Sequence, residues 1–177
     1  MALLSMIDIL ELYNNSYERI TTNAEGFFAD FYRNFFNKSD SIRALFHNVD
    51  MVKQGEIVQD SFHYLLSFYN TKQVSDYLIN LCHHHKNELV IAESLYDLWL
   101  DALLETVSHH DPHYDRETEL AWRVVLAPGI TLMKHYNPAK TVWQTTLTRT
   151  KDMAISQQRY KMLHYPADYQ GPVTLSA

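Results

Sequence analysis

The sequence predicts an all-α fold built from six to eight helices. The chain has 177 residues, of which 46% are hydrophobic, but it has only 4 glycines and 5 prolines. A β-sandwich or β-barrel needs many tight turns, so this scarcity favours long helices with few connections. Apolar residues also recur at spacings of three and four along most of the chain, which is the period of an amphipathic helix. The length is sufficient for one domain with a substantial core.

Charge and cysteine content narrow the class of protein. The formal net charge is −6, and this argues against nucleic acid or an anionic membrane as a partner, because both favour a basic surface. Cys82 is the single cysteine, which excludes an internal disulfide and indicates a reducing, cytoplasmic compartment. The sequence contains no run of 18 apolar residues, so it predicts no membrane-spanning helix. Residues 1–20 lack a basic start and read as an amphipathic helix rather than a signal peptide.

The first third of the chain predicts two helices with an unusual aromatic segment. An apolar stripe over residues 6–20 predicts the first helix. Thr22 and Glu25 then form a capping-box pattern before a new apolar run. Residues 27–36 contain six aromatic side chains, too many for a helix with one buried side. This segment is either a plain aromatic core or the wall of a pocket for a large flat molecule.

A short segment ending at Phe46 precedes a long predicted helix, residues 51–69. Asp50 is a suitable N-cap for this helix. Gln54 interrupts its apolar stripe, and a buried amide without partners costs roughly 1–3 kcal/mol. Gln54 therefore lies at the rim of the apolar face or has something to bind.

Residues 74–85 form a predicted helix that ends in three consecutive histidines. Leu78, Leu81, Cys82 and His85 fall on one face, so an apolar wall ends in an imidazole. Neutral imidazole is a good axial ligand for haem iron. The alternative is a solvated helix end, where imidazolium suits the negative end of the helix dipole.

The last predicted helices are residues 95–107 and 115–136, joined by a polar loop. Pro128 and Gly129 lie inside the second helix, where proline should kink or interrupt it. From residue 138 onward the chain is richer in threonine, glutamine and lysine. Residues 138–177 therefore read as a C-terminal extension, partly helical or disordered.

Taken in order, residues 5–136 resemble the globin family, and in particular bacterial single-domain globins and the haem domain of flavohaemoglobins. Residues 28–36, FADFYRNFF, are similar to the globin helix whose Phe-Tyr pair places a tyrosine, here Tyr32, over the distal face of the haem. Phe46 matches the phenylalanine that stacks on the haem edge. Gln54 matches the distal position that is histidine or glutamine in most globins, and Val58 follows one turn later.

The proximal side carries the same resemblance. Leu78, Leu81, Cys82 and His85 follow the apolar, apolar, small, histidine pattern of the proximal helix. Tyr96 matches the tyrosine that backs the proximal histidine in flavohaemoglobins.

The resemblance implies a globin-like bundle over residues 1–137 that encloses one haem b. It implies a five-coordinate iron that reversibly binds dioxygen or another diatomic gas, with a role in nitric oxide detoxification if a separate reductase supplies electrons. Tyr32 and Gln54 would then contact the gas. The residues expected to contact the haem are Phe46, Val58, Leu78, Leu81 and Tyr96.

Three points depart from the family pattern. Helical phase favours His85 as the iron ligand, while counting back from Tyr96 suits His84 as well, and His83 less so. The flavohaemoglobin glutamate late in the last helix would fall near Asn137, where no carboxylate lies. Any push on the iron through the histidine should therefore be weaker. No flavin or nicotinamide domain follows residue 137.

Three other functions remain open from the sequence. His63 could act as a sixth iron ligand, giving a haem suited to sensing or electron transfer. A globin-like signalling module without haem is a second alternative, although such relatives lack the proximal histidine. A zinc-binding module is a third, and its candidate ligands are His83, His84, His85, His109, His110 and His113.

Overall fold

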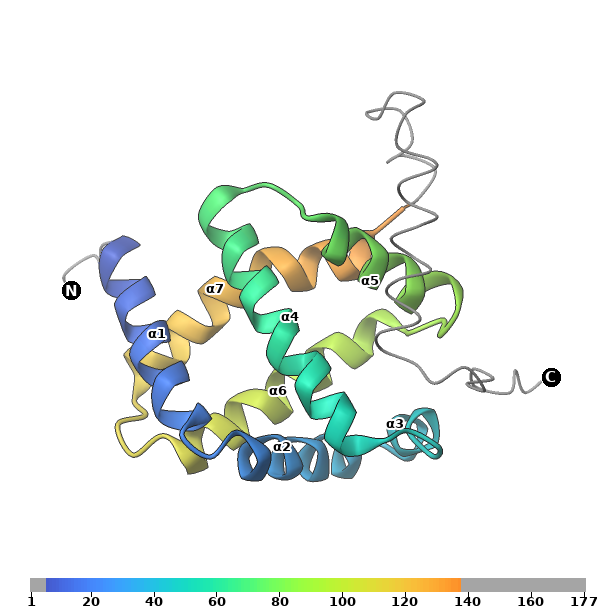
Figure 1. Ribbon diagram of the computed structural model, residues 1–177, viewed down its shortest axis with the longest axis horizontal. Coiled ribbons are helices and arrows are strands. Elements are labelled where there is room, and N and C mark those ends of the chain that lie inside the picture. Colours follow the sequence, from blue (N-terminus) through green and yellow to red (C-terminus); the bar gives the residue numbers. More distant parts are fainter. Residues whose placement is uncertain (1–5, 138–177) are drawn as a thin grey trace.

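The computed structural model describes residues 6–137 and shows seven α-helices in that range (Figure 1). Their bounds are α1 Met6–Thr21, α2 Ala24–Lys38, α3 Asp40–Leu45, α4 Met51–Thr71, α5 Asp76–Asn87, α6 Glu93–His110 and α7 Arg116–His135. The predicted all-α class is confirmed. The predicted extension, residues 138–177, lies outside the described residues. None of the described helices has the length and apolar character that crossing a bilayer requires.

Polar side chains set where most of these helices begin. The Asp50 carboxylate accepts hydrogen bonds from the Val52 and Lys53 amides, so Asp50 is the predicted N-cap of α4. The capping-box prediction at Thr22 is wrong by one residue. The N-cap of α2 is Asn23, whose side chain accepts from the Gly26 amide, because an asparagine oxygen satisfies a first-turn N–H as well as a hydroxyl does.

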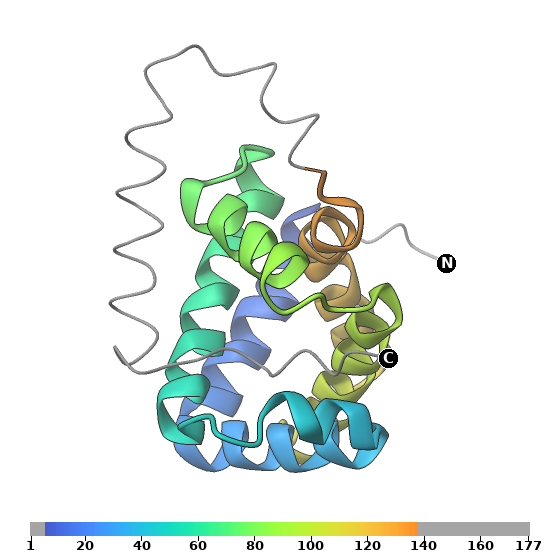
Figure 2. The same ribbon diagram turned by 90° about the vertical axis from the view of Figure 1, so that its right-hand side faces the viewer.

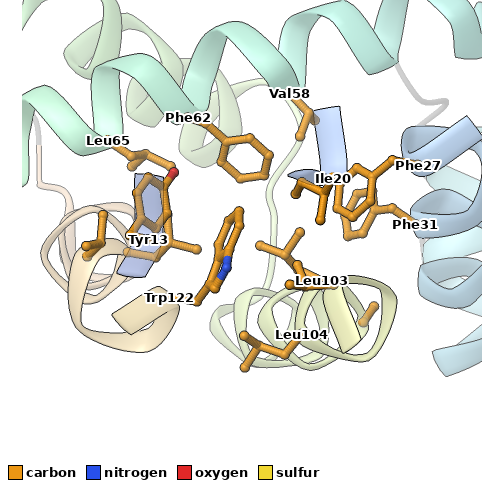
Figure 3. Packing of buried hydrophobic residues seen from close by; sticks show 14 of the residues in the cluster. Tyr13, Ile20, Phe27, Phe31, Val58, Phe62, Leu65, Leu103, Leu104 and Trp122 are labelled. Carbon is orange, nitrogen blue, oxygen red and sulfur yellow. The ribbon is translucent and has the colours of Figure 1, made fainter. Parts of the chain in front are cut away.

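The helices pack around a core in which aromatic rings dominate. α1 packs mainly on α7, α2 on α6, and α4 on α7. Trp122 of α7 lies at the centre, with ring centroids 4.6 Å from Tyr13 and 5.8 Å from Phe62 (Figure 3). All three side chains are almost fully buried. The aromatic run of α2 is buried on more than one side, as expected, through Phe27, Phe28, Phe31, Tyr32 and Phe35.

The sequence predicted that Pro128 would either kink or interrupt α7. The helix continues through Pro128 without interruption. Proline removes one backbone N–H from the helix ladder, but packing of the flanking residues compensates. Leu126 and Gly129, on either side of it, are buried.

The helices that carry the predicted site surround one region of the molecule. Figure 2 shows α5 and the α2–α3 pair on opposite sides of this region, with α4 and α6 along its flanks. Segments far apart in the sequence are thereby brought to face one another.

Candidate functional site

The three histidines at the end of α5 have three different environments. Ser75 caps this helix by accepting from the Leu78 amide, and this fixes the phase in which the histidines follow. His83 contacts Asn87, with 2.9 Å between His83 Nδ1 and Asn87 Nδ2. His84 Nδ1 lies 3.0 Å from a Glu88 carboxylate oxygen.

His85 makes the contact that the resemblance implies for a proximal ligand. Its Nδ1 lies 3.2 Å from the hydroxyl oxygen of Tyr96 on α6. Burial, and secondarily the charge of His84, lower the pKa of His85 to about 3. The imidazole is therefore neutral at physiological pH, which is the form that binds a metal. Burial, and then the nearby Cys82, raise the pKa of Tyr96, so the hydroxyl keeps its proton.

His84 differs from His85 in its partner. Its side chain is the more buried of the two, at 4% exposed, and it faces the carboxylate of Glu88, the C-cap of its own helix. A carboxylate favours the imidazolium form of a histidine. The two side chains therefore differ in their partners. The His85 imidazole contacts a phenol, and the His84 imidazole contacts a carboxylate.

The predicted distal residues come from α2, the end of α3 and the start of α4. Tyr32 is buried, and its ring centroid lies 5.5 Å from that of Phe46, the C-cap of α3. Val58 is also buried, while Gln54 is partly exposed one turn earlier on α4. The structure therefore brings Tyr32 and Phe46 into contact, and it places Gln54 at the rim of the apolar face.

On the proximal side, the predicted apolar wall is formed. Leu78, Leu81 and Cys82 are all buried. Sequence reasoning missed what lies behind this wall. Cys82 Sγ is 3.2 Å from Met133 Sδ on α7, and Tyr136 is buried at the end of that helix. No local sequence pattern could pair Met133 with a residue on α5.

His63, the alternative sixth ligand, lies against α1. Its side chain is exposed, and its ring packs edge-on to Tyr17 with 5.9 Å between centroids. This contact engages His63 with the first helix, on a face of α4 other than the one that carries Val58.

The histidines proposed for a zinc module are not assembled. Within residues 6–137, no group of three or more histidine, cysteine, aspartate or glutamate side chains is placed to hold a metal ion. His110 instead contacts the carboxylate of Asp30 over 2.9 Å, at the α2–α6 interface.

Comparison with known proteins gives one family. The family model described as Globin matches residues 29–131. The chain is similar to the crystal structure of a protein from Pseudomonas aeruginosa PAO1 described as structurally highly homologous to a human hemoglobin. The two are 38% identical, with a TM-score of 0.67, over 72% of this chain and 97% of that one. No curated protein shows a significant match.

The family model spans more than half of the chain, and it includes every predicted site residue from Tyr32 to Tyr96. The solved relative has nearly its whole length matched. The chain belongs to the globin family, whose members bind haem and, through it, a diatomic gas.

Proposed function

We propose that this globin binds haem b through His85 and reversibly binds dioxygen at a five-coordinate iron. Residues 1–137 would form the haem domain of a bacterial, cytoplasmic protein, in keeping with the reducing compartment that the single cysteine indicates. The observation that carries the proposal is the 3.2 Å contact between His85 Nδ1 and the Tyr96 hydroxyl.

The donor set fits a haem ligand. A neutral imidazole that donates its Nδ1 proton to the Tyr96 oxygen leaves a lone pair on Nε2, the atom that would hold the iron. The contact also fixes the ring orientation from a second helix, α6. His84, whose Nδ1 faces Glu88, is the second candidate.

Haem, when bound, supplies the iron at which the gas binds, and the chain supplies the surroundings of that iron. Tyr32 and Gln54 are the proposed donors of hydrogen bonds to the gas. In a site with little water, each bond worth about 1 kcal/mol adds to the next, so two would slow gas release by ~10–100-fold. The contact between His63 and Tyr17 supports five-coordination, because it engages the alternative sixth ligand elsewhere.

The decisive experiment is an absorption spectrum of the haem-reconstituted protein in ferric, reduced and oxygenated forms. The parent and His84→Ala should give a five-coordinate ferrous form that takes up dioxygen, whereas His85→Ala should lose it. Loss in His84→Ala alone would assign the ligand to His84. A six-coordinate ferrous spectrum in the parent would contradict five-coordination, and failure to take up stoichiometric haem would overturn the proposal.

Oxidation of nitric oxide to nitrate is an extension of the same site. One nitric oxide and one dioxygen yield nitrate with the addition of one electron, so a separate reductase must supply that electron. The burial of Tyr32 among aromatic rings supports this chemistry, because a dry pocket strengthens its hydrogen bond to the gas. The oxygenated parent should consume nitric oxide faster than a Tyr32→Phe, Gln54→Leu double variant. Equal rates would contradict the extension.

A further inference from the structure

A hollow of about 540 Å³ lies between α2 and the first turns of α4. Figure 1 shows the N-terminal end of α4 reaching α2 at this point. The walls are mainly apolar: Phe28, Tyr32 and Phe36 from α2, and Met51, Val52 and Gly55 from α4. Neither the globin match nor the set of residues proposed to contact haem and gas assigns a role to this hollow.

The outer end of the hollow is open to solvent. Val52, on its α4 wall, is 68% exposed, which is unusual for a valine on a packed helix. Ala29, on the α2 wall, is also exposed. The charged side chain of Arg33 at the edge is already paired with Asp30 over 2.7 Å, so it leaves the apolar walls uncovered.

The inner end of the hollow reaches Tyr32, one of the two residues proposed to contact the gas. Tyr32 belongs to its lining, yet the side chain is only 4% exposed and its ring also packs on Phe46. Gly55, another lining residue, directly follows Gln54. Phe28 and Gly55 close the remaining wall, since a Cβ added at Gly55 would meet Phe28 Cβ at 3.2 Å. Tyr32 and Phe36 are therefore both lining side chains that contact Phe46, with 5.5 and 5.3 Å between the respective ring centroids.

We propose that the α2–α4 hollow is an access path for the diatomic gas, with its mouth at Ala29 and Val52 and Tyr32 at its inner end. This rests on the proposed function above. Small apolar gases have little affinity for water and occupy apolar cavities in proteins, so walls of this kind concentrate them. A gas in the hollow would then need to pass the Tyr32 and Phe36 side chains to reach the proposed haem site.

An access path has a kinetic signature that a binding contact lacks. Narrowing the path raises one barrier that the gas crosses both on entry and on exit. Association and dissociation rates therefore fall by the same factor, and the affinity does not change. Weakening a contact to the bound gas would instead change the dissociation rate and the affinity together.

The test is flash photolysis of the carbon monoxide complex of the full-length, haem-loaded protein. Val52→Trp and Ala29→Phe place bulk at the mouth from opposite walls, at exposed positions that tolerate it. The matched control is Leu120→Trp, which adds the same ring at an exposed site on α7 outside the lining.

We expect both mouth variants to lower the bimolecular association rate about fivefold, with an equal fall in dissociation and a larger fraction of gas that rebinds before escape. Leu120→Trp should behave as the parent. Association rates in both mouth variants equal to that of the parent would overturn the access path while leaving gas binding intact. Absence of any gas complex in the parent would instead overturn the proposed function itself.

Discussion

A buried hydrogen bond joins α1 to α7 at the centre of the core. Trp122 Nε1–H donates to Ser16 Oγ over 2.9 Å, and both side chains are fully buried. The indole nitrogen can only donate a hydrogen bond, so it needs an acceptor when it is buried. Ser16 also hydrogen-bonds to the Asp111 carboxylate, which makes this small side chain serve two partners.

We expect Ser16→Ala to lower the free energy of unfolding by about 1–3 kcal/mol, because it leaves a buried N–H without an acceptor. Equilibrium urea unfolding of the parent and variant measures this loss. Ser67→Ala, at an exposed position on α4, is the control and should change stability little. An equal effect of the two substitutions would show that the Trp122 bond contributes nothing.

Val90 adopts a backbone conformation that valine rarely occupies. It lies between α5 and α6 with a φ of 50°, and its side chain is 71% exposed. In the left-handed region a Cβ crowds the neighbouring carbonyl at a cost of roughly 1–2 kcal/mol, and a β-branched side chain worsens it. The next residue, Ile91, donates its N–H to the His85 carbonyl over 2.9 Å, so the strained turn is tied to the α5 end.

Val90→Gly should raise the free energy of unfolding by about 0.5–1 kcal/mol. The free energy gained by relieving the backbone strain at Val90 exceeds the cost of the extra conformational entropy that glycine gives the unfolded chain. Val52→Gly is the matched control, since Val52 is similarly exposed but helical, and it should destabilise by about 0.3–0.5 kcal/mol, the difference in helix propensity between valine and glycine. Thermal unfolding of the two variants decides the point, and destabilisation by both would show that Val90 is not strained.

Residue patterns predicted some of these contacts and not others. Tyr96 was placed behind the histidines by resemblance, and the structure pairs it with His85. The contact of His84 with Glu88 follows from helical spacing of four residues. The Cys82–Met133 contact joins residues 51 apart, and sequence periodicity gives only the inward face of each, not the partner.

At the scale of helices, local capping chemistry predicted the start of α4 at Asp50 correctly and the start of α2 one residue too early. An N-cap side chain acts within three residues, so neighbouring polar residues such as Thr22 and Asn23 compete for the same role. The effect of Pro128 was harder to predict. A broken backbone bond is a local cost, whereas the packing that keeps α7 continuous comes from other helices.

α4 and α7 approach closely where Gly129 lacks a side chain. A Cβ added at Gly129 would lie 2.0 Å from Leu65 Cδ2, and Leu65 is buried. Glycine costs a helix about 1 kcal/mol relative to alanine, so helix propensity alone would favour its replacement. The contact between the two helices opposes that gain.

Gly129→Ala should therefore destabilise the protein, by about 1–3 kcal/mol, because Leu65 must leave its rotamer in a packed core. Leu65→Ala alone should also destabilise, through the cavity that it leaves. The double variant should cost clearly less than the sum of the two, since each change relieves the other. Additive losses in urea unfolding would place the strain elsewhere.

At the scale of the whole molecule, the fold was predictable and its long-range contacts were not. Helical periodicity and the ordered set from Tyr32 to Tyr96 indicated a globin-like bundle, which the family match confirms. Which helices pack together depends on side chains far apart in sequence. The hollow between α2 and α4 is of this kind, because its walls come from segments that no local pattern relates.

The Arg19–Asp111 ion pair is a long-range contact of this kind, joining the end of α1 to the corner before α7. Arg19 Nε lies 2.6 Å from an Asp111 oxygen, and the Asp111 side chain is 0% exposed. Burial alone would raise the pKa of Asp111, but hydrogen bonds from Arg19, Ser16 and the His113 amide, with the Arg19 charge, outweigh it. The net effect is a pKa below the ordinary value of 3.8.

The lowered pKa of Asp111 sets the sign of the pH dependence of the free energy of unfolding. The folded state holds the Asp111 proton less tightly than the unfolded chain does, so ionisation of Asp111 stabilises the fold. This contribution is complete above about pH 5 and is lost as the pH falls through 3.8 towards the lower, folded pKa.

Asp111→Asn should lower the free energy of unfolding at pH 7 by about 2–4 kcal/mol, because it leaves Arg19 without its charged partner. The difference from the parent should narrow at pH 3, where the parent also begins to lose the ionised form. Asp40→Asn is the control, since that side chain is 95% exposed and should respond little at either pH. Urea unfolding at pH 7, 5 and 3 measures the change, and a difference that stays constant down to pH 3 would show that Asp111 ionisation does not stabilise the fold.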